Sequence, residues 1–199
     1  MVTKASDLIR RALSLADLEN TSFPSAVENR EYINMAFQEI YQEAIDNGEK
    51  YWFEDVDINE GANDLPEDFY QLYDLKEIDN DYRIPRKQRN SSKNDKWYEI
   101  KNGQIILNKV HKANMEYFPM PIYLDPVGAG DVDLDFPSNI FYQICALKLA
   151  EYYKIKQNAD ISGIELLLDS AWNTYFDILK RDNDQPLVIT DVNRYRNGW

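Results

Sequence analysis

The 199-residue sequence contains one cysteine, Cys145, and one histidine, His111. A single cysteine excludes an internal disulfide, and one cysteine with one histidine cannot supply the ligand set of a structural zinc site. Cys145 stands in the apolar run Ile144–Leu147, which predicts a buried, inert thiol. His111 stands in the lysine-rich stretch Lys109–Lys112, where we expect an exposed side chain with no acid or nucleophile beside it. No metal site and no cofactor are therefore expected.

Long apolar runs are also missing. Arg10, Arg11 and Asp17 interrupt the N-terminal stretch, so it does not form the apolar region of a signal peptide. No segment approaches the roughly 20 apolar residues that cross a bilayer. The sequence thus predicts a soluble protein, made in a reducing compartment, without a membrane partner.

Three segments have the residue types of functional motifs without their spacing. Asp131–Asp135 alternates acids as a calcium loop does, yet Phe136 occupies the position of the loop's glycine and Tyr142 that of its final glutamate. We expect a strand there instead. Val127–Gly130 is not followed by the lysine of a phosphate loop. Acid pairs such as Glu67-Asp68 are common here, and sequence spacing cannot fix the separation that glycosidase chemistry requires. These observations favour a protein that is not an enzyme.

Basic residues are too few to balance the acidic ones. The chain has 22 lysines and arginines and 35 aspartates and glutamates, which gives a formal net charge of −13. Binding to the outside of duplex DNA depends on lysine and arginine at the phosphates, so the composition argues against general DNA affinity. It is compatible with lining a channel through which DNA passes without sticking. Aromatic residues make up 13% of the chain, and its 14 tyrosines and 4 tryptophans suit either interfaces or a tyrosine-rich core.

Apolar residues recurring at three and four positions predict four helices. The first covers about 4–19, and the second begins at the capping box Ser25–Glu28, where the two end residues can satisfy each other's backbone amides. The third opens near residue 138, and the fourth is capped by Asp160 or Ser162.

Between the second and third helices the pattern becomes β-like. Trp97–Leu107 holds two β-rich runs around Asn102-Gly103, a preferred hairpin turn because both turn residues adopt positive φ. Met115–Tyr123 contains two prolines, which predicts an edge strand. The polar, basic run Pro85–Lys96 predicts a mobile loop.

These elements together predict a mainly α fold. We expect a four-helix bundle with a β-hairpin-rich insertion, at about 50–135, between helices two and three, and an extended C-terminal tail. Residues 1–181 would form a single α-helical domain, and residues 182–199 the tail.

Charge is segregated along the expected insertion. Residues 54–81 hold eleven acids and one base, whereas residues 83–101 hold seven bases and two acids. Either both are solvated surfaces, or the acidic surface of one copy meets the basic loop of the next, which would set register and orientation more than affinity. The candidate inter-subunit charge pairs are Asp55, Asp57 and Glu60 on one side and Arg86, Lys87 and Arg89 on the other.

The last stretch, Asp182–Trp199, has no helical spacing. Pro186 prevents a helix from continuing, and the apolar residues after it suit the edge or groove of a partner. Aromatic and arginine side chains near the end are typical interface anchors. The tail either docks on a partner or folds back on its own bundle, and we expect docking. The candidate docking residues are Leu187, Val188, Ile189, Arg194, Tyr195, Arg196 and Trp199.

Several segments follow one another in an order that spans nearly the whole chain. They are the capping-box helix Ser25–Asn47, Asp64–Phe69, Trp97–Leu107, Met115–Tyr123, Leu134–Ser138 leading into a tyrosine-rich helix, and Trp172–Phe176 in the last helix. This order resembles the head-to-tail adaptor proteins, also called head-completion or upper tail tube proteins, of tailed bacteriophages, especially short-tailed ones. The basic run 83–96 has no counterpart in that pattern.

The resemblance implies a structural virion protein without catalytic residues. About twelve copies would form a ring under the portal protein at the head–tail junction, after synthesis in the host cytoplasm. The tail would reach the portal, the β insertion would face a downstream tail or nozzle protein, and DNA would be only a passing cargo. The charge of the chain leaves an alternative open, namely an acidic binding module or DNA-mimic inhibitor of a host protein.

Overall fold

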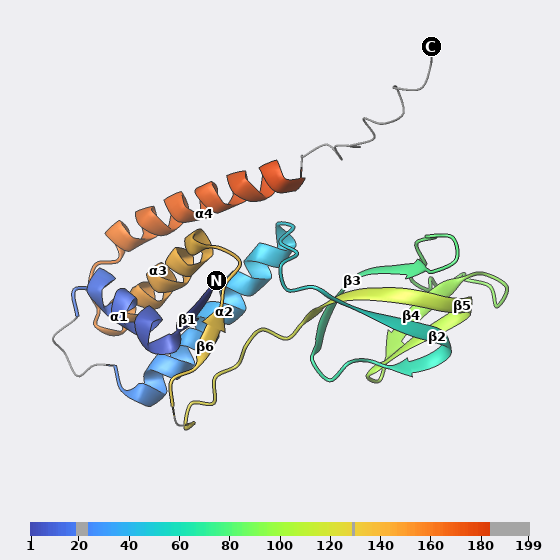
Figure 1. Ribbon diagram of the computed structural model, residues 1–199, viewed down its shortest axis with the longest axis horizontal. Helices are drawn as coiled ribbons and strands as arrows, with labels where there is room; N and C mark the ends of the chain where they lie inside the picture. Colours follow the sequence, from blue (N-terminus) through green and yellow to red (C-terminus); the bar gives the residue numbers. More distant parts are fainter. Residues whose placement is uncertain (19–23, 129, 184–199) are drawn as a thin grey trace, which may run out of the picture. The chain divides into compact units, whose positions relative to one another are not determined.

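The computed structural model describes residues 1–18, 24–128 and 130–183. It divides into two compact units (Figure 1). The helical unit consists of Met1–Glu49 together with Ile122–Trp199, and the β unit is Lys50–Pro121. The sequence placed an insertion at about 50–135. No helix in the described part of the chain is long and apolar enough to cross a membrane.

The helical unit is built around one central helix. Its elements are β1 (Val2–Lys4), α1 (Ala5–Leu15), α2 (Ala26–Asp46), β6 (Asp133–Asp135), α3 (Asn139–Lys156) and α4 (Ser162–Asn183). α3 packs against α1, α2 and α4, so it is apolar around most of its circumference. Phe141, Cys145 and Tyr153 of α3 are fully buried, which confirms the expected buried thiol. Burial also raises the pKa of the Cys145 thiol well above its usual value.

Two short strands complete the helical unit and were not predicted as a pair. β1 runs antiparallel to β6, with Thr3 opposite Leu134. The N-terminal amine donates to the backbone oxygen of Phe136 at 2.6 Å and to the Asp135 carboxylate at 3.1 Å. Leu134 and Phe136 are buried, so the alternate acids at 131–135 belong to a strand and its flank.

The β unit is organised by one long strand. β5 (Gln104–Pro119) pairs antiparallel with β2 (Glu54–Asp64), β3 (Phe69–Glu77) and β4 (Trp97–Lys101). The sheet order β2-β5-β3 puts β5 in the centre. Met115 lies between Val56 and Leu75 of the two neighbouring strands and is fully buried. The prediction of an edge strand at 115–123 was therefore wrong. Pro119 is the last residue of β5, where its missing amide does not interrupt the ladder.

The predicted fold class, a mainly α four-helix bundle, was also wrong. The four helices exist, but of the residues that the structure describes 40% are helical and 28% lie in strands, with two antiparallel sheets, which makes an α+β fold. The error has two sources. The strand content of the β unit was underestimated because β5 was not seen as a single 16-residue strand. The three-residue strands β1 and β6 are too short to show an alternating period.

Two local predictions are confirmed. Ser25 caps α2 in a capping box with Glu28. Asn102 and Gly103 have φ of 54° and 73° and join β4 to β5, with Lys101 opposite Gln104. Both signals depend on neighbouring residues alone, so they can be recognised without knowledge of the tertiary structure.

Candidate interaction surfaces

The acidic residues proposed for inter-subunit pairs lie on β2, at one edge of the sheet. Asp55 and Asp57 are exposed, and the Asn114 side-chain amide of β5 donates to both, at 3.1 and 3.3 Å. The Lys112 ammonium lies 2.8 Å from Asp57 and holds the pKa of that carboxyl below its usual value, with help from Asn114. Glu60 accepts from the Lys109 backbone amide at 3.2 Å. Asp57 is thus already paired within its own chain.

Three carboxylates form a row across the sheet. Glu116 of β5 stands opposite Asp55 of β2 on one side and Asp74 of β3 on the other. Like charges directly opposite each other destabilise a sheet, so nearby cations are needed. Arg83 Nε lies 2.8 Å from Asp74 and Lys76 Nζ lies 3.5 Å from it. The charge of Glu116, and then that of Asp74, raises the pKa of Lys76. The acidic surface is therefore partly neutralised by its own chain.

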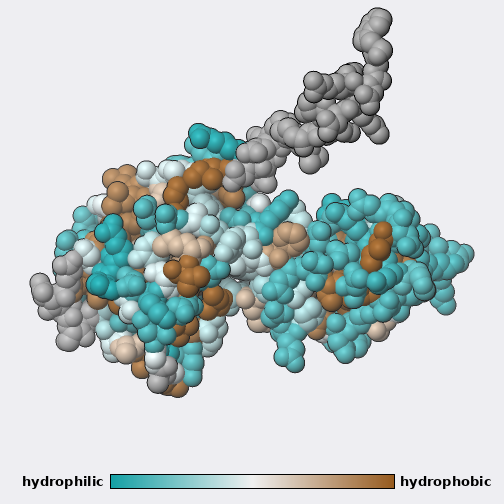
Figure 2. Space-filling model, in the orientation of Figure 1, coloured by the Kyte–Doolittle hydropathy of each residue, from teal (hydrophilic) through white to brown (hydrophobic). Residues whose placement is uncertain are grey.

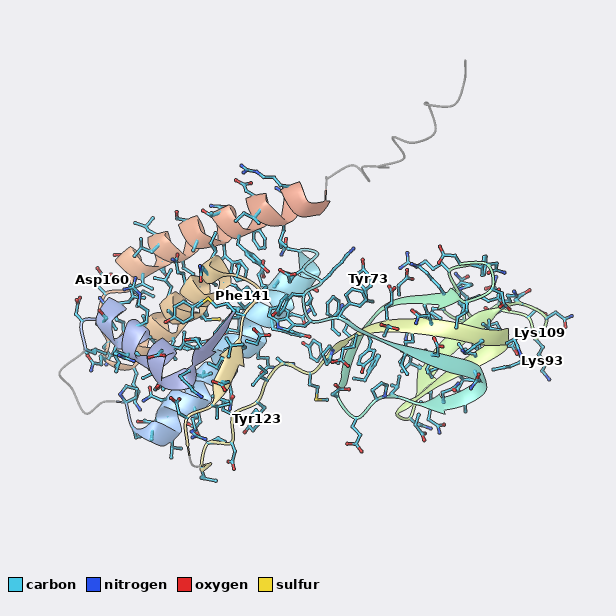
Figure 3. All side chains as sticks on the ribbon, viewed as in Figure 1. Tyr73, Lys93, Lys109, Tyr123, Phe141 and Asp160 are labelled. Carbon is cyan, nitrogen blue, oxygen red and sulfur yellow. The ribbon has the colours of Figure 1, made fainter. Side chains whose placement is uncertain are left out.

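The basic run between β3 and β4 is attached to the β unit by its backbone and side chains. The Lys87 ammonium lies 2.7 Å from Glu99 and 4.6 Å from the centre of the Trp97 ring, and it lowers the pKa of Glu99. Lys96 pairs with the buried Glu77 at 2.5 Å. Figure 3 shows the nearby lysines 93 and 109 together at one end of this unit. The run, for which the sequence pattern predicts a mobile loop, is therefore bonded to the sheet at several points.

Two of the three proposed basic partners differ from Lys87. Arg86 and Arg89 are exposed, and among the described residues no ion pair involves either side chain. Arg86 also lines a surface hollow of about 460 Å³ with Tyr73 and Tyr98. The hollow also holds Asp74 and Arg83, which pair with each other at 2.8 Å. A guanidinium that has no ion pair among the described residues is suited to binding an acidic group from another molecule.

One polar cluster in the β unit, formed by the buried Tyr117 and two exposed carboxylates, has the residue types of acid–base chemistry. The Tyr117 hydroxyl lies 3.2 Å from a Glu54 oxygen and 3.3 Å from an Asp68 oxygen. Burial, with the bond to Glu54, raises the pKa of Tyr117 to about 12. The phenol therefore stays protonated at neutral pH and donates to carboxylates, so this cluster is structural. His111 is exposed as expected, although it lies on β5 and not in a loop.

Sequence reasoning missed an apolar groove in the helical unit. α1 and α4 both pack on α3 and leave a groove of about 370 Å³ between them. Figure 2 shows hydrophobic surface along α4. The sequence feature that could have revealed exposed apolar surface here is the run Leu166-Leu167-Leu168, because three successive leucines cannot all lie on one helix face. Leu168 is buried, whereas Leu166 and Leu167 are 72% and 54% exposed. The groove is lined by Arg11, Leu15, Ile140, Gln143, Ala146, Leu147, Leu167, Ser170, Ala171 and Thr174.

The tail residues proposed for docking lie outside the described residues. They are Leu187, Val188, Ile189, Arg194, Tyr195, Arg196 and Trp199. Within the described ranges, no group of three or more histidine, cysteine, aspartate or glutamate side chains is arranged to hold a metal ion. Comparison of the sequence with models of known protein families, and with curated proteins, found no match to either.

Proposed function

We propose that this chain is a structural virion protein that forms a ring between the portal and the tail of a bacteriophage particle. The observation that carries the proposal is the charge arrangement of the β unit. The β unit has exposed acids on β2. In the run before β4 it also has two exposed arginines, Arg86 and Arg89, which have no ion-pair partner among the described residues. Opposite charges on separate parts of one subunit favour head-to-tail contact between copies.

The order of segments in the sequence supports the same proposal. In this scheme the helical unit packs against neighbouring copies, and the β unit contacts the downstream tail or nozzle protein. The tail 182–199 docks on the portal at the head–tail junction. The net charge of −13 suits a channel wall, because DNA phosphates are repelled by carboxylates and slide past without binding. No residue has a catalytic role.

The alternative, an acidic binding module or DNA mimic, needs an array of carboxylates that are free to imitate phosphates. Lys112 neutralises Asp57, and Arg83 neutralises Asp74. These internal pairs reduce the free negative charge on the sheet, which favours the structural role. An inhibitor would bind a nuclease or polymerase in a fixed stoichiometry, and a connector would not.

The experiment that tests the proposal is a mass-spectrometric inventory of purified particles of the virus that encodes the chain. A connector is recovered in a constant ratio to portal protein. Its absence from intact particles would contradict the proposal.

The charge contact can be tested by reversal. Asp55 and Glu60 are the stronger acidic candidates, and Arg86 and Arg89 the stronger basic ones, because Asp57 and Lys87 are paired within the chain. We expect D55R/E60R or R86E/R89E to impair ring assembly on portal and the combined reversal to restore it. Each exposed pair contributes at most about 1 kcal/mol and weakens with salt. D169K on α4 is the matched control, and failure of the combined reversal to rescue would remove this contact from the scheme.

A further inference from the structure

The helical unit has a second unpartnered apolar surface besides the groove. Tyr123 and Val127, in the segment between β5 and β6, are 73% and 83% exposed, and Ile122 is also exposed. Leu124, between them, is buried. The segment thus anchors one apolar side chain inward and presents its neighbours to solvent. We call the residues 122–127 the ridge.

The ridge is held firmly on α2. The Asn34 side-chain amide donates to the Leu124 carbonyl at 2.8 Å, and its oxygen accepts from the Leu124 amide at 2.7 Å. The Arg30 guanidinium donates to the Asp125 carbonyl at 2.8 Å and to the Gly130 carbonyl at 2.5 Å. Such a backbone costs little entropy to order when a partner binds, so the ridge is suited to a preformed contact.

The ridge and the groove are two different surfaces of the helical unit and share no residue. The ridge is bound to α2, α2 packs on α3, and the groove is formed on α3 by α1 and α4. Figure 3 shows Tyr123 on the side of the unit away from α4. Two different surfaces of one subunit can form a heterologous contact, which generates rings when the rotation closes.

Charge at the two surfaces is complementary. Arg11, at the rim of the groove, is exposed, and no ion pair among the described residues involves it. The Asp125 carboxylate of the ridge is exposed as well and accepts from the Val127 backbone amide at 3.0 Å. The groove therefore presents a cation beside apolar side chains, and the ridge presents an anion beside them. This match indicates a second copy of the chain as the occupant of the groove.

We propose that the ridge of one copy occupies the groove of the next, with Tyr123 against Leu167 and Asp125 facing Arg11. The inference rests on the proposed ring and identifies the contact between its helical units. It is separate from the charge contact of the β units, since no residue is shared.

The test uses the full-length chain and introduced thiols. The native Cys145 is buried with a raised pKa, so it does not compete for a thiol reagent. One copy carries Tyr123→Cys and another carries Leu167→Cys, and the mixture is treated with a short bismaleimide, both as concentrated protein and in assembled particles. Leu166→Cys is the matched control, because Leu166 is the more exposed neighbour and does not line the groove.

We expect the 123–167 mixture to cross-link at least about tenfold more than the 123–166 mixture. Neither single variant should form homodimers, and a chain with both cysteines should give a ladder of oligomers, as heterologous contacts require. Arg11→Glu in the groove copy should lower the yield of cross-linked product by up to about fivefold, which is the largest effect expected from the loss of one exposed ion pair. Asp125→Arg in the ridge copy should restore it.

Any of the following results would overturn the inference. The first is no preference for position 167 over 166 in either preparation. The second is homodimers of Leu167→Cys alone, which indicate a two-fold contact. The third is a Leu167→Cys thiol that reacts with maleimide only after residues 184–199 are removed, because the tail of the chain would then fill the groove. Particles that contain the chain in fixed ratio to portal, without the 123–167 link, would refute this contact and leave the proposed function standing.

Discussion

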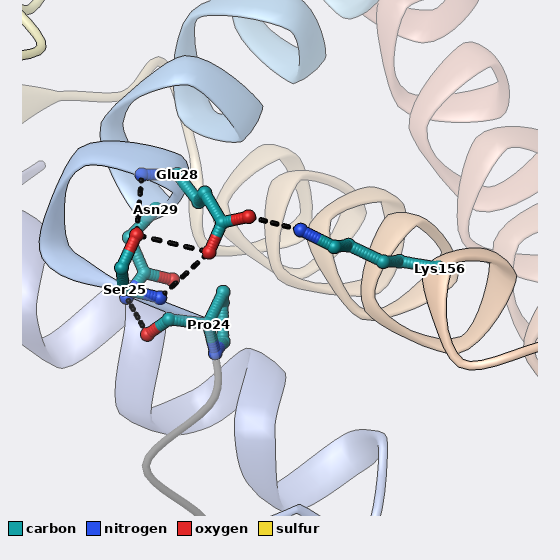
Figure 4. A network of polar contacts seen from close by, with 5 residues as sticks. All are labelled: Pro24, Ser25, Glu28, Asn29 and Lys156. Carbon is teal, nitrogen blue, oxygen red and sulfur yellow. Dashed lines mark hydrogen bonds and ion pairs between the residues drawn. The ribbon is translucent and has the colours of Figure 1, made fainter.

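The polar network at the start of α2 offers a quantitative test of how the helical unit is held together (Figure 4). Ser25 Oγ accepts from the Glu28 amide at 3.3 Å, and a Glu28 carboxylate oxygen accepts from the Ser25 amide at 3.0 Å. The second Glu28 oxygen accepts from the Lys156 ammonium in the last turn of α3. One residue pair therefore caps α2 and links it to α3.

Ser25→Ala removes the hydroxyl and leaves the Glu28–Lys156 ion pair in place. Loss of an N-cap side chain costs about 1 kcal/mol of unfolding free energy, out of a total of roughly 5–15 kcal/mol. We expect a urea midpoint lowered accordingly, measured by circular dichroism at 222 nm, since all four helices belong to the helical unit. Ser25→Thr keeps the acceptor and serves as the control. Equal stability of the alanine and threonine variants would refute the reasoning.

The same network predicts a pH dependence. The bond from Lys156, together with those from Ser25, lowers the pKa of Glu28 to about 2 from an ordinary value near 4.5. A carboxyl with a lowered folded-state pKa stabilises the protein above its unfolded-state pKa, and this contribution is lost as pH falls through the folded-state value. We expect wild type to lose the contribution between about pH 4.5 and pH 2. Glu28→Gln should lack it at pH 7 and show a shallower decline over that window. Parallel pH profiles for the two proteins would exclude the pair as a cause.

Two further predictions concern the remaining parts of the chain. Met115→Ala, at the centre of the β unit, should lower the free energy of unfolding by about 2–5 kcal/mol. It should remove amide-exchange protection from β2, β3 and β5 while α3 stays protected, and equal loss of protection in α3 would show that the units unfold together. A chain ending at Arg181 omits the proposed docking tail and the last two residues of α4, so it should keep its ellipticity at 222 nm and melting temperature but be lost from particles; unfolding, or normal incorporation, would contradict the docking role.

Local signals were the part of the fold that the sequence specified well. The Ser25 cap and the Asn102-Gly103 turn are confirmed because each is formed by residues adjacent in the chain. The pairing of β1 with β6 joins residues more than 120 positions apart, and three-residue strands carry no usable period. The sequence analysis placed residues 115–123 at a sheet edge because they contain prolines. Pro119 is the last residue of β5, where its missing amide does not interrupt the ladder.

The candidate surfaces show a similar limit. Sequence composition located the acidic and basic runs, but it could not reveal that Arg83 and Lys96 of the basic run pair with Asp74 and Glu77 of the acidic one. Nor could it reveal that Lys112 pairs with Asp57 or Lys87 with Glu99. These pairs depend on strand register, and a shift of one residue would place the side chains on opposite faces. The leucines at 166 and 167 were assigned to no surface, although an amphipathic helix has room for only one of three successive leucines in its core.

The charge of the chain determines how strong contacts between copies can be. Each copy carries a net charge of −13, so neighbouring copies repel one another over a Debye length of about 10 Å at 0.1 M salt. Against this repulsion, the proposed contacts offer one ridge in a groove of about 370 Å³ and a few exposed ion pairs. Contacts of this size fix the relative orientation of two subunits but give them a low affinity for each other. We therefore expect the free chain to remain monomeric. A portal that binds several tails at once would raise the local concentration of subunits, and the same weak contacts would then suffice to close a ring.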